Sequence, residues 1–120
     1  EVEKVYEVLW QATEIGINAA IPGATTFDVF NAMNKVISEV SVAGNNVGRL
    51  GHGLGLQLTE PPSHRDEDKT VIKENMVLTI EPGLEYAPGK MIVHEENIII
   101  NADGAEIITK RAPKEIPVIK

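Results

Sequence analysis

The pattern of apolar residues changes period along the chain, and this change limits the folds that the sequence can adopt. Up to about residue 40, apolar residues recur every three or four positions, as on one face of a helix. From residue 54 onward they alternate or run continuously over short stretches bounded by glycine and proline, which is typical of strands. Helices followed by strands predict an α+β fold, with two helices packed on a mostly antiparallel, curved sheet.

The first helix is expected at the start of the chain. Apolar residues recur at helical spacing from Val2 to Ala19, and the stretch ends at Pro22-Gly23. Proline disfavours the helical conformation at the residue before it, and glycine accepts the left-handed turn that often follows a helix. A second helix is expected to begin after Thr25 or Thr26, because either side chain can cap it.

The second helix also has charge and apolar signals. Asp28 falls in its first turn, where a carboxylate faces the positive end of the helix dipole. The stretch from Gly44 to Asn46 is expected to end it. Its apolar side consists of Val29, Phe30, Met33, Val36, Ile37 and Val40.

The second part of the chain predicts strands joined by short turns. Residues 54, 56 and 58 are leucines that alternate with glycine and glutamine, as in a half-buried strand. The apolar stretch from Met76 to Ile80 predicts a buried strand, and Asp103-Gly104 predicts a hairpin turn. The other expected elements are an irregular loop over 61–69, a turn over 86–90, strands over 91–100 and 105–109, and an edge or extended segment over 113–117.

The composition restricts which chemistry the chain can carry. Its 120 residues are about one domain and contain no cysteine, so a metal site has only histidine and carboxylate ligands to use. The 11 Lys and Arg against 18 Asp and Glu give a net charge of −7, which disfavours binding to nucleic-acid phosphates. No apolar run reaches the roughly 20 residues of a membrane-spanning helix. We therefore expect a soluble, cytoplasmic protein without a nucleic-acid or membrane partner.

Three positions are candidates for a functional site. His52 lies among glycines in the segment from Gly51 to Gly55, so its ring is accessible to a ligand; from this segment alone it is equally a turn histidine bonded to backbone carbonyls. Glu81 ends an apolar strand, where an ionised carboxylate is costly unless it is paired, binds a cation or turns out to solvent. Glu95 and Glu96 head another apolar strand, and alternation sends them to opposite faces. At most one of them therefore joins a common site through its side chain.

One imidazole and two carboxylates form a hard ligand set. Such a set suits Mn²⁺, Co²⁺, Fe²⁺ or Zn²⁺ better than a soft metal. A pair of ions about 3.5–4 Å apart needs a bridging carboxylate and further acids, of which this sequence supplies only a part. The charged stretch from Arg65 to Lys69 lacks the glycine and the final glutamate of a calcium-binding loop, and it is most simply a solvated loop.

Several motifs, taken in order, resemble one family of enzymes. They are the segments 51–56 (GHGLGL), 59–62 (TEPP), 78–83 (LTIEPG), 95–97 (EEN) and 103–109 (DGAEIIT). In this order they resemble the C-terminal half of the catalytic domain of the creatinase/aminopeptidase/prolidase superfamily, whose fold is called pita-bread. Pro22-Gly23 between two helices is similar as well, so the resemblance covers about Tyr6 to Thr109.

The resemblance implies a metal-dependent hydrolase of peptide or amide C–N bonds, similar to an Xaa-Pro aminopeptidase or dipeptidase. It implies that His52 is the imidazole ligand of one ion and that Glu95 bridges two ions. It also implies that Glu81 is a carboxylate ligand that takes the proton of the water nucleophile, while the ions stabilise the tetrahedral oxyanion. The implied cofactor is a divalent metal, manganese first, with cobalt, zinc or iron as alternatives.

The sequence departs from the family pattern at several points. The family's two metal-binding aspartates precede the part of the domain that this chain resembles, so residues 1–120 are expected to form a partial pita-bread domain that holds metal weakly alone. Seven residues after His52, where the peptidases carry a histidine that contacts substrate, this sequence has Thr59. Gly48 and Val93 occupy positions that hold a histidine and an arginine in proline-specific members.

These departures keep two alternatives open. One is a creatinase-type hydrolase of a small nitrogenous metabolite, and the other is a non-catalytic binding module on the same fold. The expected partner is a peptide or a small amide substrate. Because a half-domain exposes the apolar face that its other half covers, we also expect a homo-oligomer.

Overall fold

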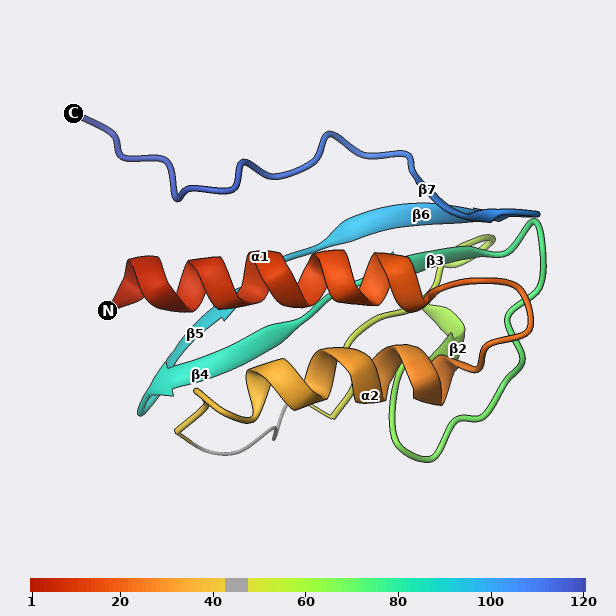
Figure 1. Ribbon diagram of the computed structural model, residues 1–120, viewed down its shortest axis with the longest axis horizontal. Helices are drawn as coiled ribbons and strands as arrows, with labels where there is room; N and C mark the ends of the chain where they lie inside the picture. The colour runs from red at the N-terminus through yellow and green to blue at the C-terminus, as the bar shows by residue number, and fades with distance from the viewer. Residues whose placement is uncertain (43–47) are drawn as a thin grey trace.

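The computed structural model describes residues 1–42 and 48–120 as two helices packed on one side of a set of short strands (Figure 1). The fold is α+β with a mostly antiparallel arrangement, as predicted. The elements are α1 (Val2–Ala19), α2 (Thr26–Ile37), β1 (His52–Gly53), β2 (Glu60–Ser63), β3 (Val77–Ile80), β4 (Gly83–Ala87), β5 (Lys90–Val93), β6 (Glu96–Asn101) and β7 (Gly104–Ile107).

The strands form two antiparallel sheets. The larger has the order β2-β1-β3-β6-β7, and the smaller consists of β4 and β5. Within the larger sheet, β3 pairs with β6 so that Ile80 lies opposite Glu96. This pairing brings the end of β3 beside the start of β6, which is where Glu81 and Glu95 occur.

The core lies between the helices and the strands. Leu9 on α1, Met33 on α2 and Ile80 on β3 are fully buried there. Gly16 allows the close approach, because a Cβ at this position would lie 2.6 Å from the sulfur of Met33 and 2.9 Å from a methyl carbon of Ile80. Among the described helices, none is long and apolar enough to cross a bilayer.

The helix starts are as predicted, whereas the end of α2 is not. Thr25 is the N-cap of α2 and forms a capping box with Asp28. The helix ends at Ile37, before the predicted stop at 44–46, which lies outside the described residues. The chain turns at this point because the Ile37 carbonyl accepts from the amides of Val40 and Ser41. Val40 is consequently 41% exposed instead of lying on the buried face of the helix.

The prediction of a strand over residues 54–58 is wrong. Only His52 and Gly53 pair as a strand, and the chain then bends up to residue 59. The Gln57 amide donates to the Glu60 carboxylate (3.1 Å), and the Gly55 amide donates to the Gln57 carbonyl (3.2 Å). These local bonds replace the ladder of a strand, and they leave Leu56 and Leu58 exposed.

Two other predicted boundaries are also wrong. The segment 61–63, predicted as loop, belongs to β2, an edge strand where proline does not interrupt a ladder on both sides. The strand predicted over 91–100 is divided into β5 and β6, which belong to different sheets. The division falls at His94, whose amide donates to the carbonyl of Pro82 (2.9 Å), one residue beyond the pairing of Gly83 with Val93.

The C-terminal segment forms no strand. In Figure 1 it runs back along α1 toward the N-terminus. Hydrogen bonds attach it to this helix; among them, the Tyr6 hydroxyl donates to the Pro113 carbonyl (2.7 Å), and the Trp10 indole donates to the Ala112 carbonyl (3.0 Å).

Candidate metal centre

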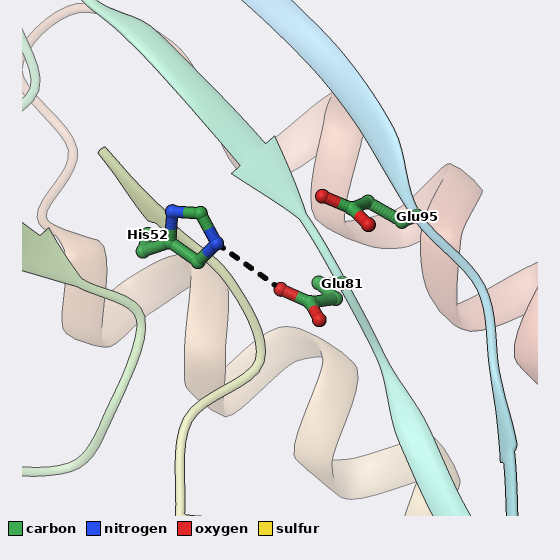
Figure 2. A group of neighbouring side chains, drawn as sticks. All are labelled: His52, Glu81 and Glu95. Carbon is green, nitrogen blue, oxygen red and sulfur yellow. Dashed lines mark ion pairs between the residues drawn. The ribbon is translucent and has the colours of Figure 1, made fainter. Parts of the chain in front are cut away.

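Three side chains from three separate segments converge at one end of β3 (Figure 2). His52 is the first residue of β1, Glu81 directly follows β3, and Glu95 lies between β5 and β6. Each offers one ligand atom, and these atoms lie within 4.8 Å of one another. The structure thus brings together the imidazole and the two carboxylates that the sequence singled out.

Glycine at position 51 allows His52 to enter the site. Gly51 has φ of 137°, and a Cβ there would lie 2.2 Å from the carbonyl oxygen of Thr79. No other residue fits so close to the β3 backbone in this conformation. The same neighbour fixes the next residue, because the His52 amide donates to the Thr79 hydroxyl (3.0 Å).

The two ring nitrogens of His52 both face oxygen atoms. Nδ1 lies 2.8 Å from the Gly53 carbonyl, and Nε2 lies 3.3 Å from a carboxylate oxygen of Glu81. A neutral imidazole has one N–H, and both oxygen partners can only accept, so the ring can donate to one of them; with the proton on Nδ1 it donates to the Gly53 carbonyl. The lone pair of Nε2 then points at a carboxylate. This arrangement is favourable only when a cation or a second proton lies between them.

A backbone hydrogen bond fixes Glu81. The Glu81 amide donates to the Leu50 carbonyl (2.9 Å), next to the segment that carries His52. The Glu81 side chain is 31% exposed, and Glu95 is also exposed. Both carboxylates therefore remain accessible to solvent and substrate, while the backbone of Glu81 is held.

The set fits a divalent ion. Donor atoms bound to one ion at about 2.1 Å lie up to about 4.2 Å apart, so separations within 4.8 Å require only small side-chain movements. One nitrogen and two carboxylate donors match the harder first-row divalent metals. Each ligand retains room for a neighbouring water or a further protein ligand.

Two residues near this centre were not identified from the sequence. His64 is fully buried, and its ring packs against Gly51, with Cδ2 2.5 Å from the place of a Cβ. Burial lowers the pKa of His64 to about 4, against the smaller opposing effects of the nearby carbonyls of Thr79 and Thr26. In the described part of the chain, neither ring nitrogen of His64 has a hydrogen-bond partner within normal geometry.

Asp68 is the second such residue. The sequence indicated a solvated loop here, yet its carboxylate accepts hydrogen bonds from the amides of Ser63 (2.8 Å) and Thr70 (3.0 Å) and from the Thr70 hydroxyl. Desolvation raises its pKa, but these bonds together outweigh that effect and lower the pKa to about 2. The bond to an amide two residues later is typical of an Asx turn, a signal that the spacing Asp-x-Thr offered.

The residues that depart from the family pattern occupy exposed positions. Thr59, the predicted substrate contact, precedes β2 and is exposed, while Val93 at the end of β5 is 48% exposed. The role of Thr59 in substrate binding stays a prediction.

Two helices on a mostly antiparallel sheet, with this cluster at the junction of three strands, define part of a pita-bread fold of the metallopeptidase type. Residues 1–102 match the sequence model of metallopeptidase family M24. The chain belongs to this family.

Relatives and solved structures agree with this assignment. The chain is 34% identical over 107 residues to an Xaa-Pro dipeptidase of Pyrococcus furiosus, which covers 89% of this chain and 31% of that protein. It superposes with a TM-score of 0.84 on a dipeptidase from Pyrococcus horikoshii OT3 at 32% identity, covering 92% of this chain and 31% of that one. A prolidase from Pyrococcus furiosus gives the same TM-score at 34% identity, with 92% and 33% covered. The chain thus spans about a third of the length of these relatives.

Proposed function

We propose that this chain forms part of the catalytic domain of a metal-dependent hydrolase of peptide or amide C–N bonds, with Xaa-Pro peptides as substrates. The observation that carries the proposal is the convergence of His52, Glu81 and Glu95 within 4.8 Å in a member of a metallopeptidase family. The relatives described as Xaa-Pro dipeptidases support the substrate class. Because the chain spans 31% of such a relative, we propose that the remaining ligands, two aspartates, lie outside these 120 residues.

Each residue of the cluster has a role in this proposal. His52 would hold a metal ion through its imidazole, and Glu95 would hold metal through its carboxylate. Divalent ions, manganese in the first place, supply Lewis acidity that acidifies a water and polarises the scissile carbonyl when they are bound. Glu81 accepts the proton of the attacking water, for which its partial exposure and its position beside His52 are suitable. Thr59 donates a hydrogen bond to the substrate.

The test uses the full-length protein that contains this chain, loaded with Mn²⁺. We expect a dipeptide with proline in second position to be cleaved faster than the same dipeptide with alanine there. Glu81→Gln should lower kcat by about 100-fold or more, because an amide cannot accept the proton. Glu106→Gln, which changes an exposed carboxylate on β7, is the matched control and should leave kcat unchanged. Full activity of the Glu81 variant would contradict the proposal.

One observation favours a second candidate, a creatinase-type hydrolase of a small nitrogenous metabolite. Val93 precedes Glu95 by two residues and places an exposed apolar side chain where the resemblance implies an arginine in proline-specific members. Valine cannot form an ion pair with the carboxylate of a dipeptide. Faster turnover of a small guanidine or amidine than of any Xaa-Pro peptide would select this candidate. Metal binding without hydrolysis of either class would instead favour a binding module.

We further propose that the protein is cytoplasmic and forms a homo-oligomer. Exposed Leu56 and Leu58 support the homo-oligomer, and the absence of cysteine from the sequence supports the cytoplasmic location. Light scattering that gives a monomer mass would contradict the homo-oligomer. Recovery of the protein from a secreted fraction would contradict the cytoplasmic location.

A further inference from the structure

Glu96 is a buried carboxylate on the opposite face of the strand from Glu95. It is 2% exposed, and it accepts hydrogen bonds from the Thr109 hydroxyl, from the Ala112 amide (2.9 Å) and from Arg111 Nη1 (3.4 Å). A buried carboxylate is tolerated only with such partners, since leaving one unpaired costs more than the bonds themselves contribute. The three donors therefore hold Glu96 firmly at the first residue of β6.

The donors come from the segment 109–112, which is fixed on α1. Arg111 donates through Nε to the Glu14 carboxylate (3.0 Å) and through Nη2 to the Trp10 carbonyl (3.1 Å). Its guanidinium group also lies 4.5 Å from the centre of the Trp10 ring. Glu96 is thus connected through this segment to a helix of 18 residues.

The other neighbour of Glu95 is held as well. The His94 amide donates to the Pro82 carbonyl, and the His94 ring contacts the Tyr6 ring edge-on at 4.4 Å. The backbone of Glu95 therefore lies between two fixed residues. Among the described residues, its own carboxylate makes no hydrogen bond or ion pair, so its position depends on those neighbours.

We propose that Glu96, held by Thr109, Arg111 and Ala112, is a positioning residue that sets the backbone of Glu95 for metal binding. This inference rests on the proposed function, in which Glu95 is a metal ligand. The role differs from ligation, because strand alternation directs the Glu96 side chain away from the ion. Residues that hold a metal ligand in place without contacting the metal typically alter metal affinity by about 10–100-fold.

The first test needs no metal. Amide relaxation of the 120-residue chain by NMR should show Glu95 rigid, with an order parameter of about 0.85, and falling toward about 0.6 in Glu96→Gln. Glu106→Gln, which changes an exposed carboxylate on the neighbouring strand, should leave Glu95 unchanged. An unchanged order parameter of Glu95 in the Glu96 variant overturns the inference.

A second pair of variants covers the case in which Glu96→Gln does not fold. Thr109→Val removes one donor and should loosen Glu95, whereas Thr109→Ser retains the hydroxyl and should restore the rigid state. Loss of stability alone would affect amides throughout the sheet, so a change spread evenly over β6 and β7 overturns the inference too. Mobility confined to residues 94–96 supports it.

The metal titration separates this inference from the proposed function. In the full-length protein that contains this chain, free Mn²⁺ measured by EPR should give a dissociation constant at least about tenfold weaker for Glu96→Gln than for the parent protein. If the full-length parent protein binds no Mn²⁺ while Glu95 loosens selectively in the variants, the positioning role stands and the metal role of Glu95 fails. If Mn²⁺ binds equally to both chains and Glu95 stays rigid, the positioning role fails and the metal role stands.

Discussion

Acid should destabilise this chain through His64 well above the pH at which carboxylates protonate. The pKa of His64 is lowered from 6.5 to about 4, first of all by burial. The unfolded chain therefore binds a proton near pH 6.5, whereas the folded chain resists it until about pH 4. The stabilising contribution of the neutral ring is complete above pH 6.5 and is lost progressively as the pH falls from 6.5 to 4.

The magnitude follows from the size of the shift. Each pH unit inside the window costs about 1.4 kcal/mol, so the whole window costs roughly 3 kcal/mol. Between pH 7 and pH 5 the expected loss in the free energy of unfolding is about 2 kcal/mol. A small domain has only about 5–15 kcal/mol in total, so the effect is readily measured.

The variant His64→Leu isolates this effect. Leucine fills a similar volume and cannot titrate, and it removes two ring nitrogens that lack hydrogen-bond partners in the described structure. We expect it to be at least as stable as the parent at pH 7 and to lose about 2 kcal/mol less between pH 7 and 5. The assay is urea unfolding followed by circular dichroism at both pH values.

The comparison also controls for the other histidines. Burial, followed by the charge of Arg111, lowers the pKa of His94, while Glu96 opposes the shift, so His94 also destabilises the fold in acid. Its contribution is present in both chains and cancels in the difference. Equal pH dependence of the parent and His64→Leu would refute the reasoning, because it would mean that the buried ring does not resist protonation.

Three further substitutions test other parts of the fold. Thr25→Ala removes the capping box with Asp28 and should cost about 1 kcal/mol in urea unfolding; Thr25→Ser should restore most of it. Gly16→Ala should lower the melting temperature although alanine favours helix, because its Cβ meets Met33 at 2.6 Å and overpacking costs about 1–3 kcal/mol. For Asp68→Asn, the free energy of unfolding should depend less on pH between 3.8 and about 2 than it does for the parent chain. The lowered pKa of Asp68 stabilises the folded chain above that range, and this contribution is lost as the pH falls through it. An unchanged pH dependence of the unfolding free energy would contradict the assignment.

Local signals predicted the helices and the buried strand of this fold. Pro22-Gly23 marks the end of the first helical region, and Thr25 with Asp28 marks the start of α2, because capping depends on residues close in sequence. The stretch from Met76 to Ile80 was recognised as a strand for its continuous apolar character, and β3 occupies most of it. Each of these features requires only neighbouring residues.

Pairing could not be predicted in the same way. Leucines at 54, 56 and 58 have the alternation of a strand, but a strand also needs a neighbouring backbone, and here Glu60 accepts the Gln57 amide first. The stretch from 91 to 100, predicted as one strand, likewise contains no signal that β5 and β6 pair with different partners. Alternation reports two faces of a segment and leaves its hydrogen-bond partner undetermined.

In the candidate site, the ligand residues could be identified from the sequence, whereas the residues that hold them in place could not. His52, Glu81 and the pair Glu95 and Glu96 were identifiable because they are polar residues in an apolar or glycine-rich setting or at the head of an apolar strand, and the family resemblance selected Glu95 from the pair. Arg111 was not, because its partners on α1 lie about 100 positions away in the chain. Ligand type is therefore a local property of the sequence, whereas the contacts that hold a ligand belong to the tertiary structure.

The register of β6 decides which residue of the sequence becomes a ligand in the tertiary structure. Because Ile80 lies opposite Glu96, the start of β6 buries Glu96 on the side of α1 and exposes Glu95 beside Glu81. A slip of one residue would exchange the two faces, placing Glu95 against Arg111 and Glu96 in the cluster. Both positions hold a glutamate, so composition alone does not exclude the slipped form. What excludes it is the shift of the following apolar residues Ile98 and Ile100 out of the core, where both are fully buried. The hydrophobic pattern of β6 thus determines which of two adjacent glutamates is available to a metal.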